Sequence, residues 1–158
     1  MNRNRYFNPR ICCLIAMLTC LSLHTWAQEG LRIGPLFEKY GRQKNVTRVE
    51  LNGSILKSYR MTIYKSLIFK EVTPYLEEIQ QAIEADKRTG TQKAQEVMES
   101  GQLLSGYYQL DDVQRKGKTQ KRYILFKLGR EESATLIYIE GSLHEEELMQ
   151  MLYKKGKR

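Results

Sequence analysis

The sequence predicts an α+β domain in which helices pack on a mostly antiparallel sheet of about five strands. Helix-period and strand-period segments follow one another along the chain, and three strand-like segments with polar, glycine-containing connections fill its last third. We expect those three strands to form a C-terminal β-meander that is followed by a terminal helix. A chain of 158 residues is also the size of one ordinary domain.

A short helix and two strands are expected first. In RIGPLFEKYG (32–41) apolar residues recur at helical spacing, Pro35 suits a first turn, and Gly41 is a plausible stop. The segments NVTRVELNG (45–53) and YRMTIYKSLIF (59–69) are rich in β-branched and aromatic residues, and the second has period-two patterning. These two segments are therefore predicted strands.

The best-marked helix lies in VTPYLEEIQQAIEADKRTG (72–90). Thr73 is expected to cap it, Pro74 fits the first helical position, and Gly90 follows the basic last turn. The next segment, TQKAQEVMESG (91–101), is read as a shorter helix, with a charged strand as the alternative.

The last third changes to a period of two. The predicted strands are QLLSGYYQL (102–110), KRYILFKLG (121–129) and SATLIYIEG (133–141). We expect the polar segment DDVQRKGKTQ (111–120) to be a hairpin loop. Ser142 and Glu145 have the spacing of a capping box, which predicts the start of the terminal helix.

The N-terminus has the three-part layout of a secretory signal peptide. Residues 1–10 carry arginines and no acid, residues 11–23 are almost wholly apolar, and Thr-Trp-Ala precedes a cut between Ala27 and Gln28. The apolar run is short of the roughly 20 residues that span a bilayer. We therefore expect a signal peptide at 1–27 and a single exported domain at 28–158 without a transmembrane segment; a retained anchor or a lipid on Cys20 are the alternatives.

Cleavage would change the composition of the working protein. It takes three of the 26 basic residues and none of the 18 acidic ones, so the net charge falls from +8 to +5. All three cysteines lie before residue 28, which excludes disulfides and thiolate metal sites from the mature chain. One histidine, His144, would remain, so we expect no metal site and no cofactor.

Tyrosines on the predicted strands are the first candidates for binding. Tyr107, Tyr108 and Tyr123 could line a groove in which their rings stack on a sugar or a peptide. The alternative is that these rings belong to the core and to cross-strand packing.

The predicted hairpin loop is the second candidate. It contains Arg115, Lys116 and Lys118, which could meet an anionic envelope surface or an acidic envelope protein. Export argues against nucleic acid as the partner of this basic loop. A solvated loop without a partner is the alternative.

No catalytic motif assembles in the sequence. The chain has no nucleophile elbow, no phosphate-binding loop and no dinucleotide fingerprint. We therefore favour a non-enzymatic interaction or binding module. The alternative is a small periplasmic hydrolase or ligand-binding enzyme whose acid-base groups are Glu50, Glu140 or His144, brought together by folding.

Several segments together resemble a known group of proteins. TWAQ, LFEKYG, NVTRVEL and the terminal ATLIYIEGSLHEEELMQML are similar to the small exported proteins of unknown function that are widespread in the Bacteroidota. The resemblance covers most of residues 28–153 and consists of packing motifs. It implies one compact α+β domain and a destination in the periplasm or at the outer membrane of a Gram-negative envelope, and it supplies no active-site residues.

Overall fold

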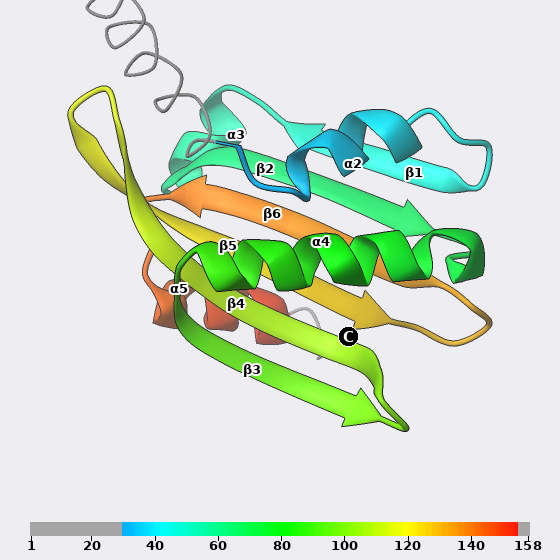
Figure 1. The fold of residues 1–158 in the computed structure, drawn as a ribbon. Helices are drawn as coiled ribbons and strands as arrows, with labels where there is room; N and C mark the ends of the chain where they lie inside the picture. Colours follow the sequence, from blue (N-terminus) through cyan, green and yellow to red (C-terminus); the bar gives the residue numbers. More distant parts are fainter. Residues whose placement is uncertain (1–29, 155–158) are drawn as a thin grey trace, which may run out of the picture. The chain divides into compact units, whose positions relative to one another are not determined.

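The computed structural model describes residues 30–154, and the part from Arg32 onward forms one compact unit (Figure 1). The predicted cleavage site at Ala27 and Gln28 lies outside the described residues. In chain order the elements are α2 (Gly34–Tyr40), β1 (Val46–Leu51), α3 (Ser54–Ser58), β2 (Met61–Phe69), the 3-10 turn η1 (Thr73–Tyr75), α4 (Leu76–Thr89), β3 (Thr91–Glu99), β4 (Gln102–Arg115), β5 (Lys118–Leu128), β6 (Ala134–Gly141) and α5 (Glu145–Lys154). The predicted α+β class is confirmed.

The strands form one sheet of six in the order β1-β2-β6-β5-β4-β3, and every neighbouring pair is antiparallel. The predicted meander is confirmed as β4-β5-β6, and the terminal helix follows it. β6 also pairs with β2, which joins the N-terminal hairpin to the meander. The edges of the sheet are therefore β1 and β3.

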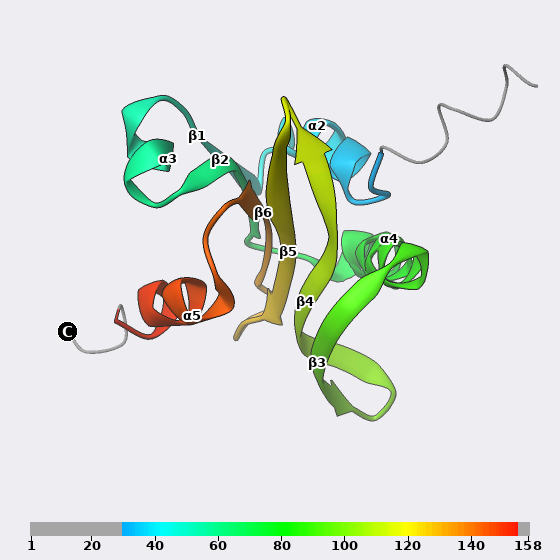
Figure 2. The ribbon, with the colours of Figure 1, turned by 90° about the vertical axis from the view of Figure 1, so that its left-hand side faces the viewer.

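Helices cover both faces of the sheet. Figure 2 shows α2 and α4 on one side of the strands, and α3 and α5 on the other. We call these two sides the α4 face and the α5 face. The alternation of side chains along each strand divides the core between them.

The core of the α4 face is a row of apolar side chains across the central strands. Leu67, Leu136 and Phe126 are register partners on β2, β6 and β5, and all three are fully buried. Ile79 and Ile83, four residues apart on α4, are buried too. Each such side chain contributes about 2 kcal/mol to folding relative to an exposed one.

The core of the α5 face is a separate cluster. Its buried members are Leu56, Met61, Tyr107, Tyr123, Ile139, Leu143 and Leu148. Leu56 comes from α3, whereas Leu143 and Leu148 flank the start of α5. Both helices on this face are therefore held by apolar contacts to one cluster.

Two helix starts differ from the prediction. Thr73 does not cap α4, because residues 73–75 form the 3-10 turn η1 and no side chain caps the α-helix. In α5 the predicted box is displaced by two residues: the backbone N–H of His144 donates to the Glu147 carboxylate at 2.7 Å. Several polar residues between 142 and 147 could form the cap of the helix. In the arrangement observed, Leu143 and Leu148 are both buried.

Two further segments are strands where the sequence predicted a helix and a loop. Residues 91–99 form β3, the additional strand of the sheet, although a helix was expected there. The expected loop at 111–120 is almost entirely strand, because β4 and β5 continue to a two-residue turn. Lys116 and Gly117 have φ of +50° and +72°, as the tight turn of a hairpin requires.

A buried carboxylate fixes the beginning of the domain. Asp86 of α4 is 1% exposed, and its two oxygens accept the backbone N–H groups of Arg32 (2.5 Å) and Ile33 (2.9 Å). Those N–H groups precede α2 and have no partner within that helix. Asp86 therefore joins α4 to the start of α2.

Candidate functional site

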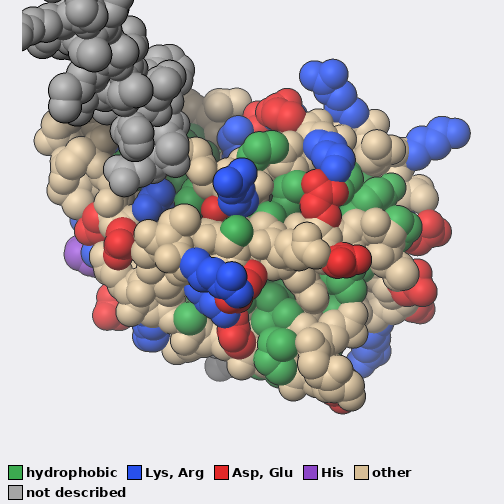
Figure 3. Space-filling view, in the orientation of Figure 1, with side chains coloured by type: hydrophobic (Ala, Val, Ile, Leu, Met, Phe, Trp, Pro, Cys, Tyr) green, Lys and Arg blue, Asp and Glu red, His purple; other side chains and the backbone are tan. Residues whose placement is uncertain are grey.

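An open cleft lies on the α4 face between α4 and the edge strand β3. It has a volume of about 190 Å³ and is lined by Gln80, Ile83, Glu84, Lys87, Glu96, Met98, Leu103 and Tyr108. We call it the α4–β3 cleft. In the space-filling view, hydrophobic side chains are visible below α4 over the β3–β4 hairpin (Figure 3). The cleft is therefore apolar on one side and ionic on the other.

The ionic side is one connected network. Lys87 Nζ lies 2.5 Å from Glu84 and 3.0 Å from Glu96, and the Tyr108 hydroxyl donates to Glu96 at 2.9 Å. Gly106, the register partner of Glu96, makes this possible, because a Cβ there would lie 2.5 Å from the Tyr108 hydroxyl. The tyrosine thus crosses a glycine to reach a carboxylate on the neighbouring strand.

The ion pair between Lys87 and Glu84 stabilises the charged form of each residue. The hydrogen bond to Glu84 raises the pKa of Lys87, and the hydrogen bond from Lys87 lowers the pKa of Glu84. Burial raises the pKa of the Tyr108 hydroxyl, which stays neutral. The pKa values of catalytic acids and bases are shifted toward the working pH, whereas the pKa values of these three side chains are shifted away from it. The arrangement suits binding better than proton transfer.

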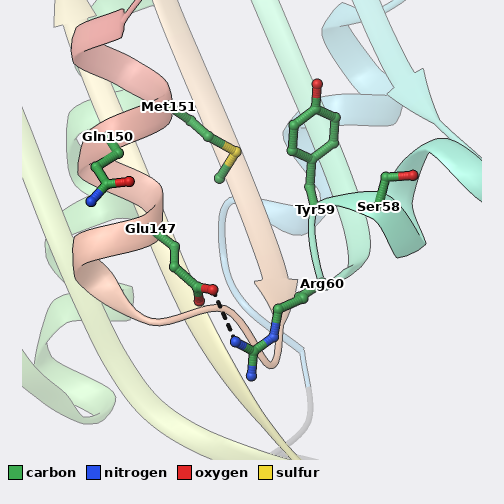
Figure 4. A pocket seen from close by; sticks show the side chains of 6 residues that line it. All are labelled: Ser58, Tyr59, Arg60, Glu147, Gln150 and Met151. Carbon is green, nitrogen blue, oxygen red and sulfur yellow. Dashed lines mark hydrogen bonds and ion pairs between the residues drawn. The ribbon is translucent and has the colours of Figure 1, made fainter.

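A second cleft, of about 200 Å³, lies on the α5 face between α3 and α5. Its lining residues are Ser58, Tyr59, Arg60, Glu147, Gln150 and Met151. Figure 4 shows Met151 and Glu147 projecting from α5 toward Tyr59 and Arg60, and Arg60 pairs with Glu147 at 2.9 Å. We call it the α3–α5 cleft. Of its lining residues, Tyr59 is an aromatic side chain that is half exposed.

The three tyrosines proposed as a stacking groove are in the interior. Tyr107, Tyr108 and Tyr123 are 7%, 1% and 0% exposed. Tyr107 and Tyr123 stack on each other at 6.1 Å on the α5 face, whereas Tyr108 lies on the opposite face. This corrects the expectation of a shared ligand platform: the helices on both faces cover the rings. Only Tyr108 reaches a cleft, through its hydroxyl.

The basic residues of the predicted loop lie at the tip of the β4–β5 hairpin. Lys116 and Lys118 are exposed there. Arg115 turns inward, and its Nε lies 3.1 Å from the carboxylate of Glu140, which is 1% exposed. Arg115 therefore ties the hairpin to the sheet, which the sequence did not indicate.

The residues considered for catalysis are held by separate partners. Glu140 accepts the hydroxyl of Tyr138 at 2.8 Å in addition to Arg115, and burial raises the pKa of that hydroxyl. Glu50 forms ion pairs with Arg48 and Lys65 near the opposite edge of the sheet.

His144 is exposed at the start of α5, on the other face from Glu140. Within the described residues no hydrogen bond or ion pair joins Glu50, Glu140 and His144 to one another, so the fold does not assemble them into one acid-base site.

Metal sites and membrane-spanning helices have requirements that residues 30–154 do not meet. No group of three or more His, Cys, Asp or Glu side chains in this range is placed to hold a metal ion. None of the helices in the described part of the chain is long and apolar enough to cross a membrane.

The α4–β3 cleft is the feature that sequence reasoning missed. The sequence favours a helix for residues 91–101 and offers a charged strand as the alternative; the strand is what forms one wall of the cleft. Met98 and Val97 are nevertheless 53% and 57% exposed, and apolar residues in a charged segment were the available signal.

One of the comparisons with known proteins identifies a family, and its description assigns no activity. No curated protein matches the sequence. A solved structure described as "Protein of Unknown Function PA94 from Pseudomonas aeruginosa, Putative Regulator" is similar with a TM-score of 0.37 and 10% sequence identity, over 73% of this chain and 81% of that one. A family model described as "Family of unknown function (DUF6108)" matches residues 20–152. The expectation of an uncharacterised domain is confirmed, and the chain belongs to this family of unknown function.

Proposed function

We propose that the protein is an exported binding module of the Gram-negative envelope, which works by holding another envelope protein and not by catalysis. The observation that carries this proposal is the pairing of open clefts with exposed apolar side chains. Met98 borders the α4–β3 cleft and Tyr59 borders the α3–α5 cleft, and each is about half exposed. Exposed apolar groups beside a polar rim are typical of protein interaction sites.

The ionisable residues support the same proposal. The pKa shifts of Glu84 and Lys87 in the α4–β3 cleft favour their charged forms, and Glu140 is enclosed by Arg115 and Tyr138. Asp86 has a carboxyl pKa raised by burial, but both its oxygens are occupied by backbone N–H groups outside the clefts. A hydrolase would need such a group free beside a cleft.

Export is proposed from the sequence of residues 1–28. The N-terminal sequence of the protein isolated from its native host tests it directly. We expect a chain that begins at or near Gln28 and is recovered with the periplasmic or outer-membrane fraction. Retention of Met1, or a lipid on Cys20, would contradict cleavage before Gln28.

Binding is tested by photocrosslinking in the native host. A photoreactive amino acid replaces Met98 in one variant, Tyr59 in a second, and the exposed Lys44 in a control, since Lys44 lines neither cleft. We expect a discrete crosslinked species from at least one cleft position and none from position 44. Identical patterns at all three positions, or no crosslink at either cleft, would overturn the proposed function.

A further inference from the structure

We propose that the free edge of β3, with the α4–β3 cleft beside it, binds an extended, basic segment of a partner protein, which adds to the sheet as a seventh strand. This inference rests on the proposed function and names the surface and the kind of partner. It requires a strand edge that is open, a pocket that can receive a side chain of the added strand, and a charge that selects the partner.

The edge of β3 is open over most of its length. β3 pairs with β4 alone and ends the sheet, and eight of its nine residues are exposed. Register shifts occur between Thr91 and Lys93 and between Val97 and Met98. The regular stretch is therefore Lys93 to Val97, about 17 Å long at roughly 3.4 Å per residue. Its outward N–H and C=O groups are available to a further strand.

The opposite edge of the sheet lacks these features. β1 is six residues long, and two of its side chains are engaged in ion pairs. Arg48 binds Glu38 of α2 and Glu50 of its own strand, each at 2.6 Å. β3 also has two such pairs, Lys93 with Glu145 of α5 and Glu96 with Lys87 of α4, but it is longer and forms a wall of the α4–β3 cleft, whereas no β1 residue lines either cleft.

The cleft is placed to receive a side chain from the added strand. Residues of an extended chain point alternately to the two faces of a sheet, so every second one would face α4. There it would meet Met98 at the edge, with Ile83 and Leu103 deeper in the cleft. Main-chain hydrogen bonds would supply affinity, and this apolar pocket would supply selectivity.

Charge favours a basic segment over an acidic one. The lining holds two carboxylates, Glu84 and Glu96, and one ammonium group, Lys87. Arg88 also pairs with Glu84, but α4 and β3 together carry six acidic and three basic residues, a net charge of −3. The protein as a whole is basic, so this local excess of acid is a distinguishing feature of the cleft. A lysine or arginine in the added strand would complement it, and an acidic residue would be repelled.

The same charges argue against a second copy as the occupant. If the stretches Lys93 to Val97 of two copies paired antiparallel over their full length, the pairing would centre on Gln95. Glu96 of one copy would then lie opposite Ala94 of the other. The two Glu96 side chains would then be diagonal neighbours, where like charges repel.

Peptide selection tests the proposal on the protein isolated from its native host. The probe is a phage-displayed library of random nine-residue peptides. We expect enriched sequences with alternating apolar residues, at least one Lys or Arg and no acid. Failure to enrich any sequence, or enrichment of acidic ones, would overturn strand addition of a basic segment.

Edge variants then locate the binding. Backbone N–H groups alternate in direction along a strand, so either Ala94 or Gln95 has an N–H group that points away from β4. Replacing that residue with proline removes a donor that an added strand would use. The fold tolerates this variant, because an edge strand accepts proline where the N–H group points outward. Circular dichroism and urea unfolding identify that variant. The affinity for a selected, fluorescent peptide should fall at least tenfold in it and in Met98→Lys.

The matched control is Tyr59→Lys, at the other cleft, which should change the affinity less than twofold. Full affinity in both β3 variants, or loss in the control, would overturn the proposal. A concentration-dependent dimer that the tolerated proline variant abolishes would assign the edge to a second copy instead. If crosslinks form at position 59 and none at 98, the binding module stands and strand addition on β3 fails.

Discussion

The two faces of the sheet bury polar groups in different ways. The α4 face encloses two carboxylates, those of Asp86 and Glu140, each 1% exposed. The buried polar groups of the α5 face include the hydroxyls of Tyr107 and Tyr123, which lie in an otherwise apolar cluster. Charge is therefore buried on the face that contains the α4–β3 cleft.

The difference shows what each face contributes. Carboxylates join elements that are distant in sequence: Asp86 holds the segment before α2, and Glu140 holds the β4–β5 hairpin through Arg115. Such contacts are directional and costly to break, because a buried donor left without an acceptor loses its hydration as well. The apolar α5 face depends on shape and area. The four predictions below test this contrast.

The largest effect is expected at Asp86. Replacement Asp86→Ala leaves the buried N–H group of Ile33 and the part-buried N–H group of Arg32 without this acceptor, and we expect a loss of about 3 kcal/mol in the free energy of unfolding. Asp86→Asn retains one acceptor and should cost about half as much. Urea denaturation measures both.

The control for Asp86 is Asp112→Ala, since Asp112 is on the surface, 3.8 Å from Lys121. It should change the stability by less than about 0.5 kcal/mol. Equal effects of the two alanine variants would contradict a special role for the buried carboxylate.

Glu140 should follow with a smaller effect. Glu140→Ala removes the acceptor of the Tyr138 hydroxyl and of Arg115. Because the Arg115 side chain is 42% exposed and can turn to water, we expect a loss of about 2 kcal/mol and not the full cost of a broken buried pair. Glu140→Gln, which keeps an acceptor, should cost about 1 kcal/mol.

Thermal or urea unfolding measures these losses. The reference is Arg88→Ala, which removes an exposed ion pair and should lower the free energy of unfolding by less than about 0.5 kcal/mol. A Glu140→Ala loss no larger than that reference would show that the hairpin is not anchored through Glu140.

The pH dependence of the Asp86 variants gives a third test. Burial raises the pKa of the Asp86 carboxyl above its ordinary value of 3.8, outweighing the two backbone N–H bonds. The folded protein thus binds this proton more tightly than the unfolded chain, so the contribution of Asp86 to stability increases as the pH falls through that raised pKa.

The stability difference between wild type and Asp86→Asn should therefore widen from pH 7 toward pH 4. Urea midpoints at several pH values measure it. A difference that narrows on acidification would mean that the two N–H groups dominate and lower the pKa.

Much of the fold was predictable because its main helices and strands bury one side and expose the other. β2 and α4 each turn an apolar side to the core, and their residues show the matching period, so the sequence located both. β3 is exposed on both faces and has no period to detect; its Ala94, Val97 and Met98 happen to have helical spacing. The outer part of the β4–β5 hairpin is exposed in the same way, which made it look like a loop.

The site was less predictable than the fold because it depends on contacts between distant segments. Glu96 and Tyr108 meet only because β3 pairs with β4 across Gly106, and Lys87 joins them from α4. Arg115 was grouped with Lys116 and Lys118 as a basic loop, yet its partner Glu140 is 25 residues away. Charge patterns along the chain do not reveal such pairings.

The smallest effects are expected on the α5 face, where two tyrosines provide a matched pair. The Tyr123 hydroxyl donates to the backbone carbonyl of Leu143 at 3.2 Å, whereas the buried Tyr107 hydroxyl has no hydrogen-bond partner within residues 30–154. Tyr123→Phe should cost about 1 kcal/mol, and Tyr107→Phe should be neutral or stabilise by up to about 1 kcal/mol, because it removes a desolvated group that gains nothing.

Both substitutions delete one oxygen atom from stacked rings in one cluster, so the difference between them isolates the hydrogen bond. Urea unfolding of both variants measures that difference directly. A Tyr107→Phe loss equal to that of Tyr123→Phe would mean that the Tyr107 hydroxyl has a partner in solution, such as a buried water. The α5 face would then depend on polar contacts as the α4 face does.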